Sequence, residues 1–399
     1  MEVLPPDSGE EVGETASPEE GNSFIEDTGV ERLEGPVPAL FAEDRILELE
    51  ISLDRDAVSD LGRNPTEYVA GELLYEGVPL AVGVRLKGSS SMDDLSGKPS
   101  FKIHFGFVVE GGELEGNNKL NLHNMRYDPM KMSEELSYGM WRDAGLPASR
   151  TGYARVKVNG ADYGLYSMVE VADDPMLARW YDDPRGNLYE NAANYCDLDD
   201  GIGCFDREED DEGSDAALEA LIAAAVAPGT GLGGLSDLID WDRYPKFLAM
   251  EMSIAHWDSY AFDQSNYRFY HEPGTDRWSQ IPSSMDLGFG YRPWSYPTCG
   301  RHGVDPATYT MGLLARRCLE DAACEAKVLE EILAAADRLE VMDTSARLRA
   351  TADRIRDAVR DDPRRLTSMG EFEDHLDCVE SWLSGRPAEL RAWVEARRG

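Results

Sequence analysis

Apolar and polar residues alternate with a period of two along the first part of the chain. This alternation is found in residues 46–53, 67–74, 80–86 and 100–109. A period of two is typical of strands that bury one face, so the sequence predicts an N-terminal β-sheet. Two later alternating runs, residues 153–158 and 163–171, flank Asn159-Gly160, a pair typical of hairpin turns.

The strand expected at residues 100–109 separates two kinds of side chain. Phe101, Ile103 and Phe105 fall on one face, and Lys102 and His104 fall on the other. Because the apolar face is the one expected to be buried, we expect Lys102 to point into a cleft.

The hydrophobic period changes after residue 173. Apolar residues then recur at spacings of three and four, which predicts helices at 215–226, 244–257, 322–339, 345–360 and 372–397. One earlier helix is expected at 129–144, with Leu136 and Met140 on its apolar stripe. The expected fold class is α+β and bilobal, with a β-rich N-lobe over 45–172 and a mainly helical C-lobe over 173–399. Residues 1–44, acidic at their start and rich in Gly, Pro and Ser, are expected to be a disordered acidic linker.

The charge of the chain is strongly negative. Its 399 residues include 39 Lys and Arg against 77 Asp and Glu, for a net charge of −38. Such a chain repels nucleic acid and anionic membrane surfaces, so neither is an expected partner, whereas basic protein substrates are favoured over acidic ones. No apolar run approaches the roughly 20 residues that span a bilayer, so direct membrane insertion is not expected.

The cysteines are even in number and partly close in sequence. Cys196 and Cys204 flank a short loop, Cys318 and Cys324 are six apart, and Cys299 and Cys378 are left over. This pattern indicates disulfides in an oxidising compartment, and hence a secreted, cell-surface or periplasmic protein. Free thiols in a reducing cytosol are the alternative. The connectivity is open at this stage, and the spacing argues against zinc.

Residues 256–290 carry the candidate chemistry. Asn266 follows Asp258 by eight residues, and Asp286 stands immediately before Leu287-Gly288. Phosphoryl transfer needs one carboxylate to orient the attacking hydroxyl, and further Asp or Asn side chains to hold Mg²⁺ on the phosphates. Asp258 is therefore the expected catalytic residue, Asp286 a metal ligand, and Asn266 or Asp263 the second metal ligand. A single Asp taken alone is more often a turn cap.

A cation and a flexible turn are also needed to hold a nucleotide. The turn at residues 88–91 offers backbone N–H groups beside Ser89 and Ser90, and candidate phosphate-binding lysines stand near it, in decreasing order of preference Lys102, Lys98 and Lys87.

Several segments together resemble the spore coat protein H (CotH) kinase family over roughly residues 45–290. They are Val84-Arg85-Leu86-Lys87-Gly88-Ser89-Ser90-Ser91, Lys98-Pro99-Ser100-Phe101-Lys102-Ile103, Leu120-Asn121-Leu122, Gly145-Leu146-Pro147-Ala148-Ser149-Arg150, Val158-Asn159-Gly160, Gly164-Leu165-Tyr166, Glu170 and Gly186-Asn187-Leu188-Tyr189. The resemblance implies an atypical protein-kinase-like fold that binds ATP with Mg²⁺, or Mn²⁺, and phosphorylates Ser or Thr of protein substrates.

The resemblance also implies roles for other residues. Glu134 or Glu135 would pair the phosphate-binding lysine, and Met168, Glu170 and Val171 would form the segment between lobes that meets adenine. Two departures from ordinary protein kinases are visible. The Asn stands eight rather than five residues after the catalytic Asp, and Trp257 replaces the Arg before it. Activation-loop control through that Arg is therefore not expected.

Two other classes of function stay open on the sequence. The chain would also suit a secreted adhesion module without catalysis, although such a module has no need of Asp258, Asn266 and Asp286 together. A kinase-like enzyme that transfers AMP, or that phosphorylates a small molecule, would use the same lysine and aspartates.

Overall fold

The alternating strands of the N-terminal half close into a barrel with the order β1-β2-β3-β4-β5-β7-β6. Neighbouring strands are antiparallel except for β1 and β6, which pair in parallel. The strands are β1 (Ile46–Ser52), β2 (Val69–Tyr75), β3 (Val78–Lys87), β4 (Ser100–His104), β5 (Lys119–His123), β6 (Thr151–Val158) and β7 (Ala161–Glu170). Their inward side chains, mostly Leu, Ile, Val and Phe, form a buried cluster of their own. Closure leaves no exposed sheet edge, which periodicity alone does not predict.

The computed structural model describes residues 37–208, 214–229, 231–295, 297–341 and 344–399. All of them belong to one unit of the chain, Leu33–Gly399. Most of the linker expected at residues 1–44 lies outside the described residues.

One expected strand is shorter than its pattern. β4 ends at His104, and the chain then turns, with the Gly112 N–H donating to the Val109 carbonyl at 2.8 Å. A Cβ on Gly112 would lie 2.3 Å from the Phe105 carbonyl oxygen, so the backbone closes on itself at this glycine. The prediction of a strand through residue 109 was wrong because the apolar residues after Phe105 belong to an exposed turn.

A second sheet, with the order β11-β10-β8-β9, follows the barrel. Its antiparallel strands are β8 (Asn187–Asn191), β9 (Phe205–Arg207), β10 (Tyr267–Glu272) and β11 (Arg277–Pro282). The region after residue 173 is mainly helical, as the sequence predicts, but the sequence did not predict the sheet within it. β11 is buried from Trp278 to Pro282 on both faces, so the period of two that marks a half-exposed strand is weak there.

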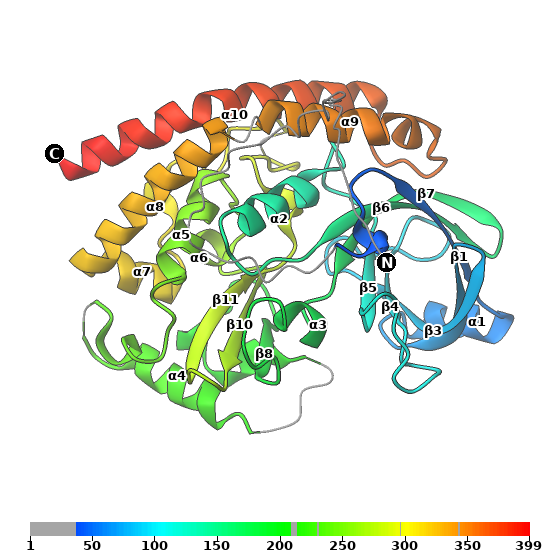
Figure 1. The fold of residues 1–399 in the computed structure, drawn as a ribbon, viewed down its shortest axis with the longest axis horizontal. Helices are drawn as coiled ribbons and strands as arrows, with labels where there is room; N and C mark the ends of the chain where they lie inside the picture. Colours follow the sequence, from blue (N-terminus) through cyan, green and yellow to red (C-terminus); the bar gives the residue numbers. More distant parts are fainter. Residues whose placement is uncertain (1–36, 209–213, 230, 296, 342–343) are drawn as a thin grey trace, which may run out of the picture. The chain divides into compact units, whose positions relative to one another are not determined.

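Helices make up most of the remaining structure (Figure 1). The α-helices are α1 (Arg55–Arg63), α2 (Ser133–Asp143), α3 (Asp174–Leu177), α4 (Ala216–Val226), α5 (Tyr244–Ser253), α6 (Tyr260–Asp263), α7 (Leu313–Leu319), α8 (Ala322–Val341), α9 (Thr344–Asp361) and α10 (Met369–Arg398). Short 3₁₀ helices are η1 (Ala39–Phe41), η2 (Leu198–Asp200), η3 (Ile202–Cys204), η4 (Gly233–Leu235), η5 (Met285–Leu287) and η6 (Pro306–Thr308). The fold is α+β, as the sequence predicts.

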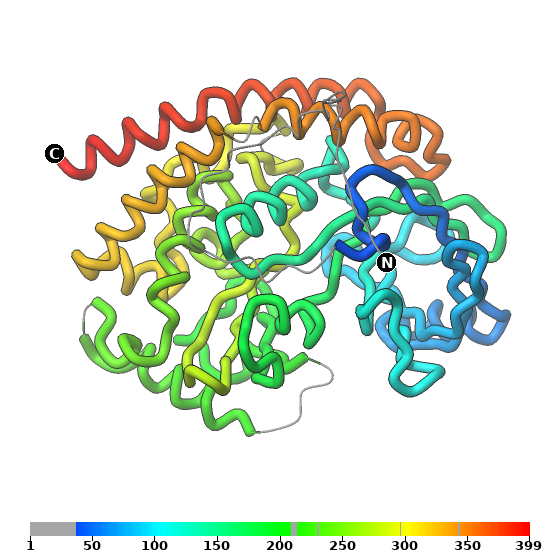
Figure 2. The backbone as a smooth tube through the Cα atoms, viewed as in Figure 1, coloured from blue at the N-terminus to red at the C-terminus, as the bar shows by residue number. Residues whose placement is uncertain are grey.

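The C-terminal helices connect back to the barrel. Helix α10 lies along α8 and α9, and the segment after α9 meets β7 (Figure 2). There the Asp362 carboxylate accepts a hydrogen bond from the Leu165 N–H at 3.1 Å and forms a buried ion pair with Lys98. Within the described residues, no helix is long and apolar enough to cross a lipid bilayer.

All six cysteines are paired. The bonds are Cys196–Cys204, Cys318–Cys324 and Cys299–Cys378. The two close pairs are those that sequence proximity indicates, and the two cysteines left over bond to each other. Three disulfides are compatible with an oxidising, extracellular location.

Candidate active site

Two adjoining cavities lie against the outer face of strands β3 to β5. Because side chains alternate along a strand, Leu86, Phe101 and Leu122 point into the barrel and their neighbours point outward. We call one the turn cavity: it is lined by Gly88, Ser89, Ser90, Ser91, Ser100, Asn124, Met125, Tyr127, Glu134, Asn194, Asp258, Asn266, Asp286 and Leu287. The other, the strand cavity, is lined by Arg85, Lys102, Asn121, Tyr138, Ser149, Val169, Glu170, Val171, Ala172, Glu190, Glu208, Arg268 and Ser283. Lys87, His123 and Ser284 line both.

The glycine-serine turn after β3 requires a glycine at its start. Gly88 has φ +126°, and a Cβ there would lie 2.8 Å from Ser91 Oγ and 3.0 Å from the Met92 nitrogen. Tyr127 donates its hydroxyl hydrogen to the Ser90 carbonyl at 2.8 Å. The turn is thus held from its carbonyl side, and Ser89 and Ser90 face the turn cavity, where the sequence places a phosphate-binding turn.

Asp258 is oriented by Asn266. The Asn266 amide donates to Asp258 Oδ2 at 2.7 Å and to the Asp258 carbonyl at 2.8 Å, which leaves the Asn266 amide oxygen as an acceptor. Burial, reinforced by the neighbouring Asp263, raises the pKa of Asp258 to about 7. A carboxylate with a pKa near neutrality is suited to act as a general base.

Buried acidic side chains hold the loop that carries Asp258. The Glu251 carboxyl group accepts from the Ala261 N–H at 3.2 Å. Asp197 accepts from the Tyr260 hydroxyl at 2.9 Å, the Gln264 amide at 3.2 Å and the Leu313 N–H at 2.6 Å. The catalytic-loop candidate is therefore fixed by contacts that come from outside its own sequence segment.

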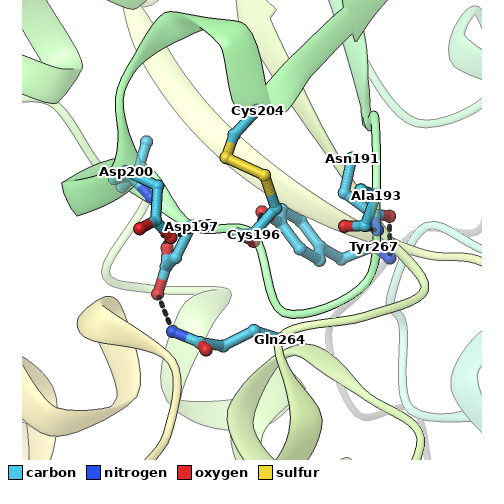
Figure 3. The surroundings of a disulfide bond; sticks show 9 residues. Asn191, Ala193, Cys196, Asp197, Asp200, Cys204, Gln264 and Tyr267 are labelled. Atoms are coloured by element: carbon cyan, nitrogen blue, oxygen red, sulfur yellow. Dashed lines mark hydrogen bonds between the residues drawn. A yellow bond between two sulfur atoms is a disulfide. The ribbon is translucent and has the colours of Figure 1, made fainter.

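A disulfide secures the segment that contributes Asp197 (Figure 3). Cys196 bonds to Cys204, and the Tyr267 hydroxyl donates to the Cys196 carbonyl at 2.7 Å. The same segment carries Asn194 to the wall of the turn cavity. Sequence reasoning did not select Asn194, because only the tertiary structure brings this loop to the cavity.

Asp286 lies in η5 at the same cavity. Burial, together with the nearby carboxylates of Glu134 and Asp258, raises its pKa well above the usual range. Mutual repulsion of this kind is relieved by a bound cation, so the donor set fits a divalent metal. Among the described residues, no group of three or more His, Cys, Asp and Glu side chains is arranged to hold a metal. Such an ion would take its other ligands from Asn266, phosphate oxygens and water.

The three candidate lysines differ in which cavity they line. Lys98 is buried in its ion pair with Asp362 and lines neither cavity. Lys102 lines the strand cavity, and Lys87 lines both cavities. Lys87 Nζ donates to His123 Nε2 over 2.6 Å, and burial lowers its pKa to about 8. The ammonium thus remains the main form at neutral pH.

The two glutamates of α2 point in different directions. Glu134 accepts from His123 Nδ1 at 2.9 Å and faces the turn cavity. Glu135 accepts from Arg354 at 2.6 Å and from the Thr351 hydroxyl at 3.0 Å, on the side of α9. Of the two alternatives, the structure brings Glu134 to the lysine side of the site.

The predicted adenine segment is brought only partly to a cavity. Glu170 and Val171 line the strand cavity, with Glu170 also paired to Arg179 at 2.6 Å. The Met168 side chain is packed in the barrel interior, as the alternation along β7 dictates. Asp263 lies close enough to Asp258 to affect its pKa but lines neither cavity.

Sequence reasoning missed His123 and Asn124 as well as Asn194. The signal for His123 was present: Leu120 and Leu122 alternate with Asn121 and His123 along β5, so a sheet with one buried face directs both polar residues outward. That outward face became recognisable as a cavity wall only when β5 was placed beside β3 and β4.

Comparison with known proteins identifies a matching family. The family model described as CotH kinase protein matches residues 84–390. Invasin CotH2 of Rhizopus delemar is 23% identical over 322 residues, covering 73% of this chain and 53% of the invasin. Invasin CotH3 of the same organism is 24% identical over 208 residues, covering 47% of this chain and 35% of that invasin. The chain thus spans about half, or less, of the length of these two relatives.

Inner spore coat protein H of Bacillus subtilis is 22% identical over 330 residues, covering 78% of this chain and 87% of that protein. Similar solved structures include a HipA, HipB and operator DNA complex of Shewanella oneidensis and the proinflammatory kinase CtkA of Helicobacter pylori. The first has a TM-score of 0.40 at 11% identity and covers 88% of this chain and 73% of that one. The second has a TM-score of 0.30 at 10% identity and covers 83% of this chain and 95% of that one. Both scores are too low to establish a shared fold.

Proposed function

The chain belongs to the CotH kinase protein family, and on that premise we propose that it is an ATP- and Mg²⁺-dependent atypical kinase. It would transfer the γ-phosphate to Ser or Thr hydroxyls of a protein. The observation that carries this proposal is the meeting of Asp258, Asn266 and Asp286 with the Gly88 turn in one cavity. Catalysis of phosphoryl transfer is mainly positioning and charge stabilisation, and these groups supply both.

Each residue has a defined task in this proposal. Asp258, held by Asn266, accepts a hydrogen bond from the substrate hydroxyl and takes its proton as the oxygen attacks the γ-phosphorus, while the bond from that phosphorus to the β–γ bridging oxygen breaks and ADP leaves. Asp286 and the Asn266 amide oxygen would hold Mg²⁺, or Mn²⁺, and the bound ion would neutralise charge on the phosphates. Backbone N–H groups of the 88–91 turn and an ammonium from Lys87 or Lys102 bind phosphate oxygens.

The site supports a bilobal organisation as part of the same proposal. The turn cavity is lined by Lys87 and Ser89 from the barrel side and by Asp258 and Asp286 from the part after residue 173. A nucleotide would bind between an N-lobe over 45–172 and a C-lobe over 173–399, with adenine near Glu170 and Val171 in the strand cavity.

The expected partners and location follow from charge and disulfides. A net charge of −38 favours a basic protein substrate. The three disulfides suit a secreted, cell-surface or periplasmic enzyme. Relatives named invasin and spore coat protein agree with such a location.

Incubation with ATP labelled separately at the γ- and α-phosphate tests the proposal. The protein is given Mg²⁺ or Mn²⁺ and a basic acceptor protein, beside Asp258→Asn and the control Asp242→Asn, whose side chain is 84% exposed. We expect γ-label in wild type and control, and at least a hundredfold loss in Asp258→Asn with ATP binding retained, because removal of a positioned base costs about 10²–10⁴ in rate.

Other results would contradict the proposal in distinct ways. Transfer of α-label would show AMP transfer. ATP binding and hydrolysis without a labelled protein would indicate a small-molecule acceptor. Absence of ATP binding would leave the adhesion function standing.

A further inference from the structure

A histidine lies between the lysine and the glutamate that face the candidate phosphate site. His123 ends β5, Lys87 ends β3, and Glu134 is in the first turn of α2. Lys87 Nζ is 2.6 Å from His123 Nε2, and His123 Nδ1 is 2.9 Å from both Glu134 oxygens. The His123 side chain is 15% exposed and that of Glu134 is 4% exposed, so water competes little with these bonds.

The chemistry of the groups fixes the direction of both hydrogen bonds. A lysine ammonium only donates, so Nε2 of His123 must accept and carry no hydrogen. Nδ1 then carries the hydrogen and donates to the Glu134 carboxylate. The arrangement requires a neutral imidazole, in agreement with the lowering of the His123 pKa by burial.

We propose that His123 is a positioning residue, which bridges Lys87 to Glu134 and so fixes the Lys87 ammonium at the boundary of the two cavities, against the phosphates of the bound nucleotide. This inference rests on the proposed function. It assigns the phosphate contact to Lys87, while Lys102 remains a wall residue of the strand cavity. The orientation of the Lys87 side chain then depends on His123 of the sheet as well as on Glu134 of helix α2.

The position of the bridge explains why an imidazole is used. One hydrogen bond runs from Lys87 to His123 and the other from His123 to Glu134, so the ring spans the space between strand and helix. The bridge also couples α2 to the barrel, because its three members come from β3, β5 and α2. A change that removes the ring would take the His123 donor from the buried Glu134 carboxylate, which keeps the hydrogen bond from the Ser167 side chain, and would take the His123 acceptor from the Lys87 ammonium.

Substitution of His123 separates positioning from mere packing. In His123→Gln the amide oxygen can accept from Lys87 and the amide nitrogen can donate to Glu134. In His123→Phe the ring volume is kept and both hydrogen bonds are lost. We expect the Kd for ATP, measured by calorimetry, to rise at least tenfold in His123→Phe and to stay within threefold of wild type in His123→Gln. His104→Phe, at the end of β4 and outside both cavities, is the control and should leave Kd unchanged.

The melting temperature distinguishes a structural role. If His123→Phe lowers the melting temperature while ATP binds the folded protein with wild-type Kd, the positioning role is overturned. Equal Kd values for the Phe and Gln variants, both far above wild type, would also overturn it, because the hydrogen bonds would then not be what matters.

A nucleotide-free measurement separates this inference from the proposed function. The ¹⁵N shifts of the imidazole in the full chain, assigned by the signal lost in His123→Gln, should show hydrogen on Nδ1 and none on Nε2 at pH 7. Hydrogen on Nε2, or on both nitrogens, would overturn the bridge. If wild type binds no ATP while the Nδ1 form is found, the proposed function fails and with it the phosphate contact, whereas the bridge itself stands.

Discussion

At the scale of single residues, burial controls the protonation of Glu251. This side chain lies under the loop that carries Asp258 and caps the Ala261 N–H. Burial raises its pKa from 4.5 to about 8. The folded state therefore holds a proton that the unfolded chain releases above pH 4.5, and the stabilisation is lost as pH rises from 4.5 to 8.

Glu251→Gln should remove this pH dependence. The amide still accepts from the Ala261 N–H but does not titrate, so the variant should gain stability relative to wild type by up to about 1.4 kcal/mol per pH unit between about pH 5 and 8. Urea unfolding at several pH values measures the difference. A constant difference across this range would show that Glu251 titrates normally.

Lys98 was a candidate phosphate-binding residue, but in the structure it forms a buried ion pair with Asp362. Breaking a buried ion pair costs about 3–5 kcal/mol because one charge is left without a partner. We expect Lys98→Met to lose stability of that order without changing the Kd for ATP, and Lys98→Met with Asp362→Asn to recover most of it. Lys87→Met should instead weaken ATP binding. If Lys98→Met folds normally and fails to bind ATP, the phosphate contact belongs to Lys98 after all.

At the scale of elements, the turn after β3 depends on Gly88. The positive φ and the 2.8 Å approach to Ser91 Oγ both oppose a side chain. We expect Gly88→Ala to raise the Kd for ATP at least fivefold, since the turn must open. Gly77→Ala is the matched control: Gly77, in the hairpin between β2 and β3, also has a positive φ, of 80°, but a Cβ added there would meet no atom within 4 Å. Gly77→Ala should lose stability and keep its ATP affinity. Equal effects of Gly88→Ala and Gly77→Ala on the Kd for ATP would show that the turn at residues 88–91 is not part of the binding site.

At the scale of the whole molecule, Cys299–Cys378 ties the segment after Asp286 to α10. It spans 79 residues, whereas Cys318–Cys324 spans six. A cross-link that closes a longer loop restricts the unfolded chain more, by about 4.5 kcal/mol for the long loop and about 2 kcal/mol for the short one. Replacing each pair by serines should lower the free energy of unfolding in that order, as measured by denaturant titration. The reverse order would mean that native packing, and not loop length, sets their contributions.

The sequence by itself determined the elements whose periodicity is local. The alternating runs that became β1 to β4, β6 and β7, the long helices α8 to α10, and the order of Asp258, Asn266 and Asp286 all follow from residues near one another in the chain. Local spacing could also indicate the two close cysteine pairs. It did not single out β11, because a strand buried on both faces loses the alternation that marks a strand.

The tertiary structure alone decided which polar residues meet. Antiparallel pairing of β3 with β4 and of β4 with β5 set their outward faces side by side and brought Lys87 to His123, while Asp362, far along the chain, engaged Lys98. Disulfide Cys196–Cys204 and the Asp197 contacts carried Asn194 to the site. The physical reason is that hydrogen bonds and ion pairs act over a few ångströms of space, whereas the sequence orders residues by position along the chain.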